Sequence, residues 1–319
     1  MTRMLAAIFA VALAWSGVWV WMSMSLRGEI EAWFDTRRAD GWAAEYGDLS
    51  IKGFPNRLDV TLSDLVLADP DTGTVWEAPF LQIFRLIYRP GHHIVAFPDS
   101  QQLRQNGQDY AIGSEGLRAS VISDAESQVL RANIESAVLN IAGSEGTLAL
   151  AGVALGASRG ESESSYVLGL GIDQMAGADS AFAPDNAQAV VVRMIADFDQ
   201  PWRITPQKDR PQPRQLDVRL AELRAEPLVL KMTGALDLDP QGRASGEMTL
   251  RADNWREGLA QAKAEASLPD WVVDLTETGL GALAALGNGT SLDLTVRLDR
   301  GQAWLGIFPL GALPPLRLP

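Results

Sequence analysis

The sequence predicts a mainly β protein with an N-terminal transmembrane helix. After the helix we expect an elongated, curled antiparallel β-sheet, shaped as a trough or a sandwich, with two short helices near the C-terminus. Three observations support this fold class. They are an uncharged apolar run at the N-terminus, segments in which apolar and polar residues alternate, and turn-forming residues between those segments.

The N-terminal run, residues 4–26, carries no charged side chain. At about 1.5 Å per residue it covers roughly the 30 Å hydrocarbon core of a bilayer. Trp19 and Trp21 lie near its far end, where aromatic belts occur. A cleaved signal peptide is the alternative, because Ala12–Ala14 offers small residues at a suitable spacing. The apolar run continues past that point, so we favour an uncleaved signal anchor at residues 1–27.

The charges around this helix leave its orientation open. Arg3 precedes the helix, whereas Arg27, Arg37 and Arg38 follow it, so the positive-inside rule does not favour export. A large acidic domain behind a short N-terminal tail, however, favours export of that domain from the cytoplasm. We expect a single-pass inner-membrane protein with its bulk in the periplasm, and a helix that ends before Gly41.

Strands follow the helix. Residues 57–67 alternate between apolar and polar side chains, with an interruption at Ser63–Asp64, and residues 292–298 alternate in the same way. Period-2 alternation indicates a strand with one apolar face. Asp-rich and Gly-containing turns are expected at 69–73, 239–242 and 299–301.

The order of segments gives a domain plan. Residues 28–199 form the N-terminal part of a periplasmic β-domain, and residues 200–214 form a proline-rich connector. Residues 215–319 form the C-terminal part of the same β-rich domain. A helical insertion is expected at about 254–287, between an Asn start signal and a Gly-Asn-Gly stop.

Composition excludes several functions. The net charge of −13 and the pI near 4.6 argue against binding to a nucleic acid or an acidic membrane surface. No cysteine is present, so disulfides and thiolate metal sites are excluded. The two histidines, His92 and His93, are expected in a turn, and on a strand adjacent side chains would face opposite sides. We therefore expect no catalytic residue, no metal and no cofactor, and predict that the protein is not an enzyme.

The apolar faces of the strands are the candidate site. Few helices are available to cover them, so the sheet either closes on itself or leaves a groove that could hold a lipid chain. Whether each inward-facing residue belongs to a groove or to a core stays open. The predicted inward-facing residues are Leu58, Val60, Leu62, Leu65, Leu67, Leu292, Leu294, Val296 and Leu298.

Short segments along the chain carry a family resemblance. They are the N-terminal anchor, Gly53-Phe54-Pro55 with the alternating strand after it, Trp76–Pro79, Tyr88–Pro90, Gly306–Gly311 and Leu313–Leu316. With these the chain resembles an uncharacterised alphaproteobacterial family, domain-of-unknown-function family 2125, which has no catalytic residues to transfer. Its plan is similar to that of AsmA-like envelope proteins. That resemblance implies a curled sheet with an apolar groove and a part in moving phospholipid between membranes.

Two functions follow as hypotheses. The first is a non-enzymatic inner-membrane protein that binds phospholipid or a lipid-linked molecule in an apolar β-groove, in envelope lipid transport or homeostasis. The alternative is a periplasmic scaffold or assembly factor that binds an envelope protein partner through its sheet edges.

Overall fold

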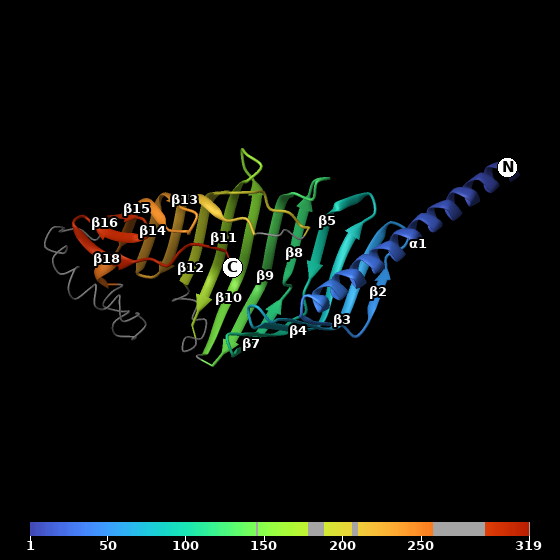
Figure 1. The fold of residues 1–319 in the computed structure, drawn as a ribbon, viewed down its shortest axis with the longest axis horizontal. Coiled ribbons are helices and arrows are strands. Elements are labelled where there is room, and N and C mark those ends of the chain that lie inside the picture. Colours follow the sequence, from blue (N-terminus) through green and yellow to red (C-terminus); the bar gives the residue numbers. More distant parts are fainter. Residues whose placement is uncertain (145, 178–187, 206–209, 258–290, 319) are drawn as a thin grey trace. The chain divides into compact units, whose positions relative to one another are not determined.

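The computed structural model describes residues 1–144, 146–177, 188–205, 210–257 and 291–318 (Figure 1). The chain forms two compact units. The first contains residues 1–153 and 177–179, and the second contains the rest of the chain. The division falls inside one long strand, β10 (Gly146–Arg159). The segment 200–214, expected as a connector, links two paired strands of the second unit.

The helix α1, Thr2–Ala39, is long and apolar enough to cross a membrane. It ends as the sequence predicts. Gly41, at φ +89°, donates its backbone N–H to Arg38, and Trp42 donates its N–H to Arg37. This pair of bonds is the Schellman motif, which places glycine just beyond a helix end because glycine tolerates positive φ.

In the described part of the chain, eighteen strands belong to one antiparallel sheet, which confirms the predicted fold class. The strands that begin in the first unit are β1 Ala43–Glu45, β2 Leu49–Lys52, β3 Arg57–Asp69, β4 Thr74–Leu86, β5 Arg89–Ala96, β6 Ser100–Gln105, β7 Gln108–Glu115, β8 Arg118–Ser123, β9 Val129–Gly143 and β10 Gly146–Arg159. The strands of the second unit are β11 Ser165–Ala176, β12 Gln188–Phe198, β13 Pro213–Ala225, β14 Leu228–Leu238, β15 Ala244–Asp253, β16 Ser291–Asp299, β17 Gln302–Leu305 and β18 Phe308–Ala312.

The second unit is a simple meander. Each strand from β11 to β18 pairs antiparallel with the next strand along the chain. Tight turns make this order possible. At the β14–β15 turn, the Asp239 carboxylate accepts the backbone N–H groups of Gln241 and Arg243, while Gly242 takes φ +80°. An aspartate that bonds its own turn, followed by a glycine at positive φ, is the chemistry that the sequence predicts there.

The first unit is more complex. Two long strands, β4 and β9, are bridged by two short ladders that lie next to each other along them. One ladder is β5 with β8, and the other is β6 with β7. Each half of β4 therefore pairs with a different strand.

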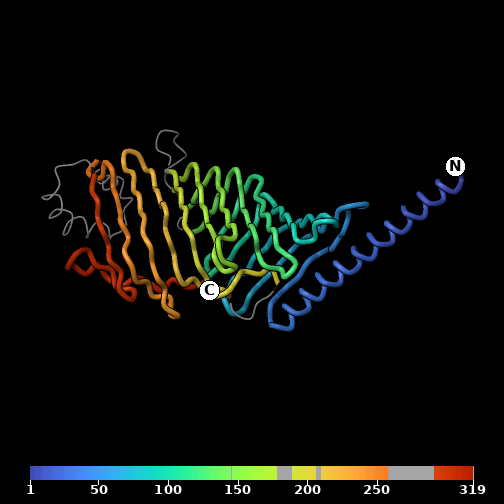
Figure 2. Tube along the Cα trace, turned by 90° about the horizontal axis from the view of Figure 1, so that it is seen from above, coloured from blue at the N-terminus to red at the C-terminus, as the bar shows by residue number. Residues whose placement is uncertain are grey.

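A core lies between α1 and the first strands. It contains buried Phe34, Ala44, Leu49, Val60, Leu62 and Leu65, with Leu26 and Ile30 of the helix packed against them. The helix residues that turn away from solvent, from Ser16 to Arg37, recur every three or four positions. This spacing is the apolar stripe of a helix that packs on a surface. Figure 2 shows the N-terminal part of α1 extending past the strands that its C-terminal half contacts.

Local features of the structure agree with some of the sequence predictions and differ from others. The turn at 69–73 is confirmed between β3 and β4. The interruption at Asp64 is also real, because this residue has φ +50° and lies opposite Pro79. The two histidines are not in a turn but inside β5, which begins at Arg89. The expected insertion begins with helical residues 255–257, and residues 258–290 lie outside the described part of the chain.

Candidate functional site

The second unit carries one continuous apolar face. Because directly paired residues of an antiparallel sheet point to the same side, the register of β11 to β16 defines rows of side chains that cross all six strands. Four successive rows contain only apolar residues and glycine. We call these four rows the apolar face.

The first row contains Tyr166, Ala196, Leu216, Leu236, Gly246 and Leu298; the second Leu168, Met194, Val218, Gly234, Met248 and Val296; the third Leu170, Val192, Ala221, Met232, Leu250 and Leu294; and the fourth Ile172, Val190, Leu223, Leu230, Ala252 and Leu292.

Burial changes across these rows. In the first row most side chains are buried, and Val218 and Met248 of the second row are buried as well. In the third row every residue is half-buried or exposed, and Met232 is 37% exposed. In the fourth row Ala252 is buried and its neighbours are half-buried. The side chains of the apolar face are therefore mostly buried in the first row and mostly half-buried in the third and fourth rows.

Aromatic rings pack together at the end of the strands that holds the first row. Phe198 stacks edge-on against Tyr166 and Trp202, at ring distances of 5.9 and 5.5 Å. The Tyr166 hydroxyl accepts the backbone N–H of Trp202 at 3.1 Å, so this polar group is satisfied although the side chain is buried.

The C-terminal segment runs along the turns at the same end. Leu313 donates its backbone N–H to Gly301, and Leu316 donates to Gly242, each at 2.8 Å. Leu318 exchanges two hydrogen bonds with the side chain of Gln212. Three turns of the meander are thereby connected by one extended segment.

The opposite side of these strands is charged. Here Glu222 of β13 forms ion pairs with Arg224 and with Lys231, the residue of β14 with which it is paired. Nearby, a hydrogen bond from the Ser291 hydroxyl and, second, one from Arg251 lower the pKa of the Asp253 carboxyl. From β13 to β16 the sheet of the second unit therefore carries ionised side chains on the side opposite the apolar face.

The predicted residues of β16 lie on the apolar face. Leu292, Leu294 and Val296 are half-buried, Leu298 is buried, and the residues between them, such as Thr295, are exposed. The structure brings these four together with equivalent residues of five other strands. The third-row residues Leu170, Val192 and Met232 were not among the predicted residues, although alternation within each strand is a signal for them.

The predicted residues of β3 have a different environment. Leu58, Val60, Leu62 and Leu65 are fully buried and Leu67 is half-buried. Val60, Leu62 and Leu65 form one core with Phe34 of α1. These side chains are covered by the protein's own helix, and lipid contact at the β3 positions stays a prediction.

Away from the helix, the apolar row of the first unit also becomes more accessible. This row is a series of paired residues. It runs from Val60 of β3 through Ile83 of β4, Val95 of β5 and Ala119 of β8 to Ile134 of β9. Val60 is 2% exposed, whereas Ile134 at the end of the row is 42% exposed.

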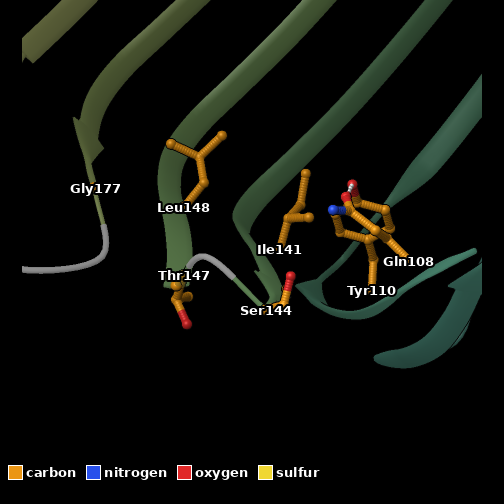
Figure 3. A pocket seen from close by; sticks show the side chains of 9 residues that line it. Gln108, Tyr110, Ile141, Ser144, Thr147, Leu148 and Gly177 are labelled. Carbon is orange, nitrogen blue, oxygen red and sulfur yellow. Dashed lines mark hydrogen bonds between the residues drawn. The ribbon is translucent and has the colours of Figure 1, made fainter. Parts of the chain in front are cut away.

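A shallow cavity of about 320 Å³ lies at the ends of β7, β9 and β10 (Figure 3). Ile141, Leu148 and the Tyr110 ring line it, and the Tyr110 hydroxyl donates a 2.6 Å hydrogen bond to the Gln108 side chain. Among the residues that the structure describes, the lining has no carboxylate, histidine or basic side chain. These residues give the cavity a small apolar surface.

The two histidines of β5 have separate environments. His92 bonds the Ser120 hydroxyl at 3.2 Å, and burial, followed by the charge of Arg85, lowers the pKa of His93. Their partners in β8 place the two rings on opposite sides of the strand. Within the described ranges no cluster of three His, Asp or Glu residues could hold a metal ion.

The comparisons with known proteins give one match. The model of a family described as "Uncharacterized protein conserved in bacteria (DUF2125)" matches residues 19–314. Neither the curated proteins nor the solved structures contain a match to the chain. The matched range covers both units and most of α1, and the chain therefore belongs to the DUF2125 family of bacterial proteins.

Proposed function

We propose that this protein is a non-enzymatic, inner-membrane-anchored protein that binds phospholipid or a lipid-linked molecule on the apolar face of its second unit. In this proposal α1 spans the inner membrane once and the β-sheet lies in the periplasm, where the protein serves envelope lipid transport or homeostasis. The observation that carries the proposal is the row of apolar, incompletely buried side chains in the third row, on a sheet that carries ion pairs on its other side.

The dimensions of the apolar face suit an acyl chain. Six strands about 4.8 Å apart place the outer strands of a row about 24 Å from each other. An acyl chain fills half of a bilayer core of about 30 Å, so it spans about 15 Å there. One row is therefore long enough for one chain.

The energetics are also favourable. Burial of a methylene group contributes about 0.8 kcal/mol, so a chain of about sixteen carbons has a gross driving force near 13 kcal/mol. No catalytic group is needed for this binding, because the hydrophobic effect is not directional. A resemblance to AsmA-like envelope proteins supports the same function by analogy of fold.

Paired substitutions test the proposal. Met232→Glu and Leu294→Glu place a charge on the third row, while Thr233→Glu and Thr295→Glu place the same charge on neighbouring exposed positions of the same strands. The full chain is purified in mild detergent, and bound phospholipid is measured by mass spectrometry. We expect about one phospholipid per wild-type chain and per control chain, and a loss of lipid in the two third-row variants.

Circular dichroism distinguishes binding from folding. The proposal requires that the third-row variants keep their strand content and lose their lipid. A wild-type protein that carries no phospholipid would contradict the proposal, and so would a third-row variant that retains lipid at the wild-type ratio.

The scaffold function is a second candidate, favoured by β18. This strand pairs with β17, all its residues are exposed, and it carries Phe308 and Leu310 after the exposed Ile307. An exposed apolar strand at the end of a meander can take an added strand from a partner. Pro309 removes one donor from that strand, which limits the added ladder. A stoichiometric protein partner that is lost in a Phe308→Asp variant, together with absence of lipid, would favour this function.

A further inference from the structure

The helix α1 is attached to the tip of the sheet at an unexpected point along its length. The indole nitrogen of Trp15 donates a 2.8 Å hydrogen bond to the carbonyl of Pro55, and that of Trp19 donates one of the same length to the carbonyl of Arg57. The Trp19 ring also contacts Phe54 edge-on at 5.7 Å. The loop between β2 and β3 is thereby fixed against the middle of the apolar run.

The part of the helix beyond these contacts is too short to cross the hydrocarbon core by itself. Residues 2–14 are all exposed and extend beyond these contacts, but at about 1.5 Å per residue they cover only about 20 Å. A hydrocarbon core of about 30 Å needs about twenty residues. If the span begins at Met4, Trp19 lies roughly 8 Å inside the far boundary of that core.

We infer that the tip of the sheet, formed by residues 53–57 and the neighbouring β4–β5 turn at 86–90, is inserted into the lipid leaflet beside α1. The two segments lie together, because Ile87 donates its backbone N–H to Asn56 and Leu86 pairs with Arg57. The occupant of this surface is the acyl region of a bilayer. The inference rests on the membrane anchor of the proposed function and is independent of lipid binding on the apolar face.

The side chains of the tip suit this location. Phe54 is 56% exposed and Tyr88 is 62% exposed, although both are aromatic. With Trp15 and Trp19 they place four aromatic rings at the tip and the adjoining helix. Aromatic side chains with a polar atom are enriched where hydrocarbon meets headgroups.

Four backbone carbonyls at the tip have hydrogen-bond donors within the protein. The carbonyls of Pro55 and Arg57 accept the two indole N–H groups, that of Asn56 accepts Ile87, and that of Gly53 accepts the N–H of Arg57. Pro55 has no N–H to satisfy. In lipid an unpaired backbone group costs several kcal/mol, so these four bonds lower the cost of placing the loop there.

Basic residues lie at the edges of the tip. Lys52 precedes it, and Arg57 and Arg89 belong to its two segments; all three are exposed. Arg57 forms an ion pair with Asp59, two residues further along β3. Long basic side chains can reach the headgroup phosphates while their stems stay in hydrocarbon. The tip thus combines exposed aromatic side chains with basic side chains that are long enough to reach the headgroups.

Single cysteines test the inference directly, because the chain contains no native cysteine. Phe54→Cys and Tyr88→Cys are introduced separately into the full chain, labelled with a nitroxide, and reconstituted in vesicles of phosphatidylethanolamine and phosphatidylglycerol. The matched control is Thr72→Cys, in the turn at the other end of the β3–β4 hairpin. Electron paramagnetic resonance then compares collisions of each label with oxygen, which concentrates in lipid, and with a water-soluble nickel chelate.

We expect the oxygen-to-nickel collision ratio at positions 54 and 88 to be several-fold higher than at position 72. Equal ratios at positions 54, 88 and 72 would overturn the inference. A fourth label at Ile8→Cys, on the free part of α1, separates two failures. If position 8 is in lipid and position 54 is in water, the anchor holds and the inserted tip is wrong. If position 8 is also in water, the anchor itself is wrong.

Discussion

The indole nitrogen of Trp19 lies 2.8 Å from the backbone carbonyl of Arg57, to which it donates a hydrogen bond. Trp19 belongs to the uncharged part of α1, and Arg57 begins β3. This bond and its neighbour from Trp15 fix the first strands against the helix. They set the height of the first unit relative to any membrane that the helix crosses.

Removal of these indole donors should loosen the first unit. Trp15→Phe and Trp19→Phe keep an aromatic ring but leave one carbonyl without its donor, and each should reduce the free energy of unfolding by about 1 kcal/mol. The double variant should lose about 2 kcal/mol. Trp21→Phe is the control, because Trp21 is 70% exposed. Thermal unfolding in detergent, followed by circular dichroism, measures the difference, and an unchanged double variant would contradict the assigned bonds.

Truncation of Phe34 should be the most destabilising change in α1. Its ring is 2% exposed in the core of the first unit and packs edge-on against Tyr46 at 4.7 Å. Phe34→Ala should reduce the free energy of unfolding by about 3–5 kcal/mol, because a buried cavity remains. Trp33→Ala, at the more exposed neighbouring position, should cost clearly less. Chemical denaturation of both variants in the same detergent compares them, and equal losses would show that the face of α1 is assigned incorrectly.

The second unit should lose stability in acid through Asp253. The hydroxyl of Ser291 and the guanidinium of Arg251 lower the pKa of this carboxyl in the folded protein. A lowered pKa means that the stabilisation is fully present above the unfolded aspartate pKa and is lost as the pH falls through the folded value. Ser291→Ala removes the first cause and should therefore move the acid-induced loss to higher pH.

Asp253→Asn should remove this part of the pH dependence. Unfolding curves recorded between about pH 6 and about pH 2 provide the measurement, since the unfolded aspartate titrates near pH 4. An Asp253→Asn variant with the same acid sensitivity as the wild type would show that this carboxyl does not contribute.

Gly234 should not tolerate a side chain. It lies in the second row at φ +149°, and an added Cβ would lie 2.2 Å from the carbonyl oxygen of Glu247. Gly234→Ala should destabilise the second unit by about 1–3 kcal/mol, because the paired strand must move. Gly171→Ala is the control, since its added Cβ would have no neighbour within 4 Å. Thermal unfolding should show a loss for the first variant and little change for the second.

Much of the fold is predictable because it depends on local patterns. The alternation of Leu292, Leu294, Val296 and Leu298 indicates one face of β16, and the structure shows that face. Gly41 marks the end of α1 because a helix ends most easily at a residue that accepts positive φ.

Other features depend on contacts between distant parts of the sequence. The bonds from Trp15 and Trp19 join residues that are 40 and 38 positions apart, and nothing in either segment specifies the partner. The apolar rows require the register of six strands, including an irregularity in β13 between Val218 and Ala221. A sequence pattern gives the face of each strand, but only the register shows that the faces align.

Pro90 shows how a local rule can mislead. Pro90 with Gly91 has the composition of a turn, yet both residues lie inside β5, and the reversal of the chain comes earlier, at Ile87–Tyr88. The ladder between β5 and β8 begins at His92, so Pro90 does not have to supply a donor to it. A missing N–H at such a position has no cost.

The pairing of β11 to β18 with successive chain neighbours has an evolutionary consequence. A hairpin inserted at, or deleted from, one of its turns would leave the other pairings unchanged, because each ladder is local in sequence. Relatives could therefore differ in the number of hairpins and keep the same meander topology. The width of the surface offered to a guest molecule would then vary in steps of two strands, or about 10 Å.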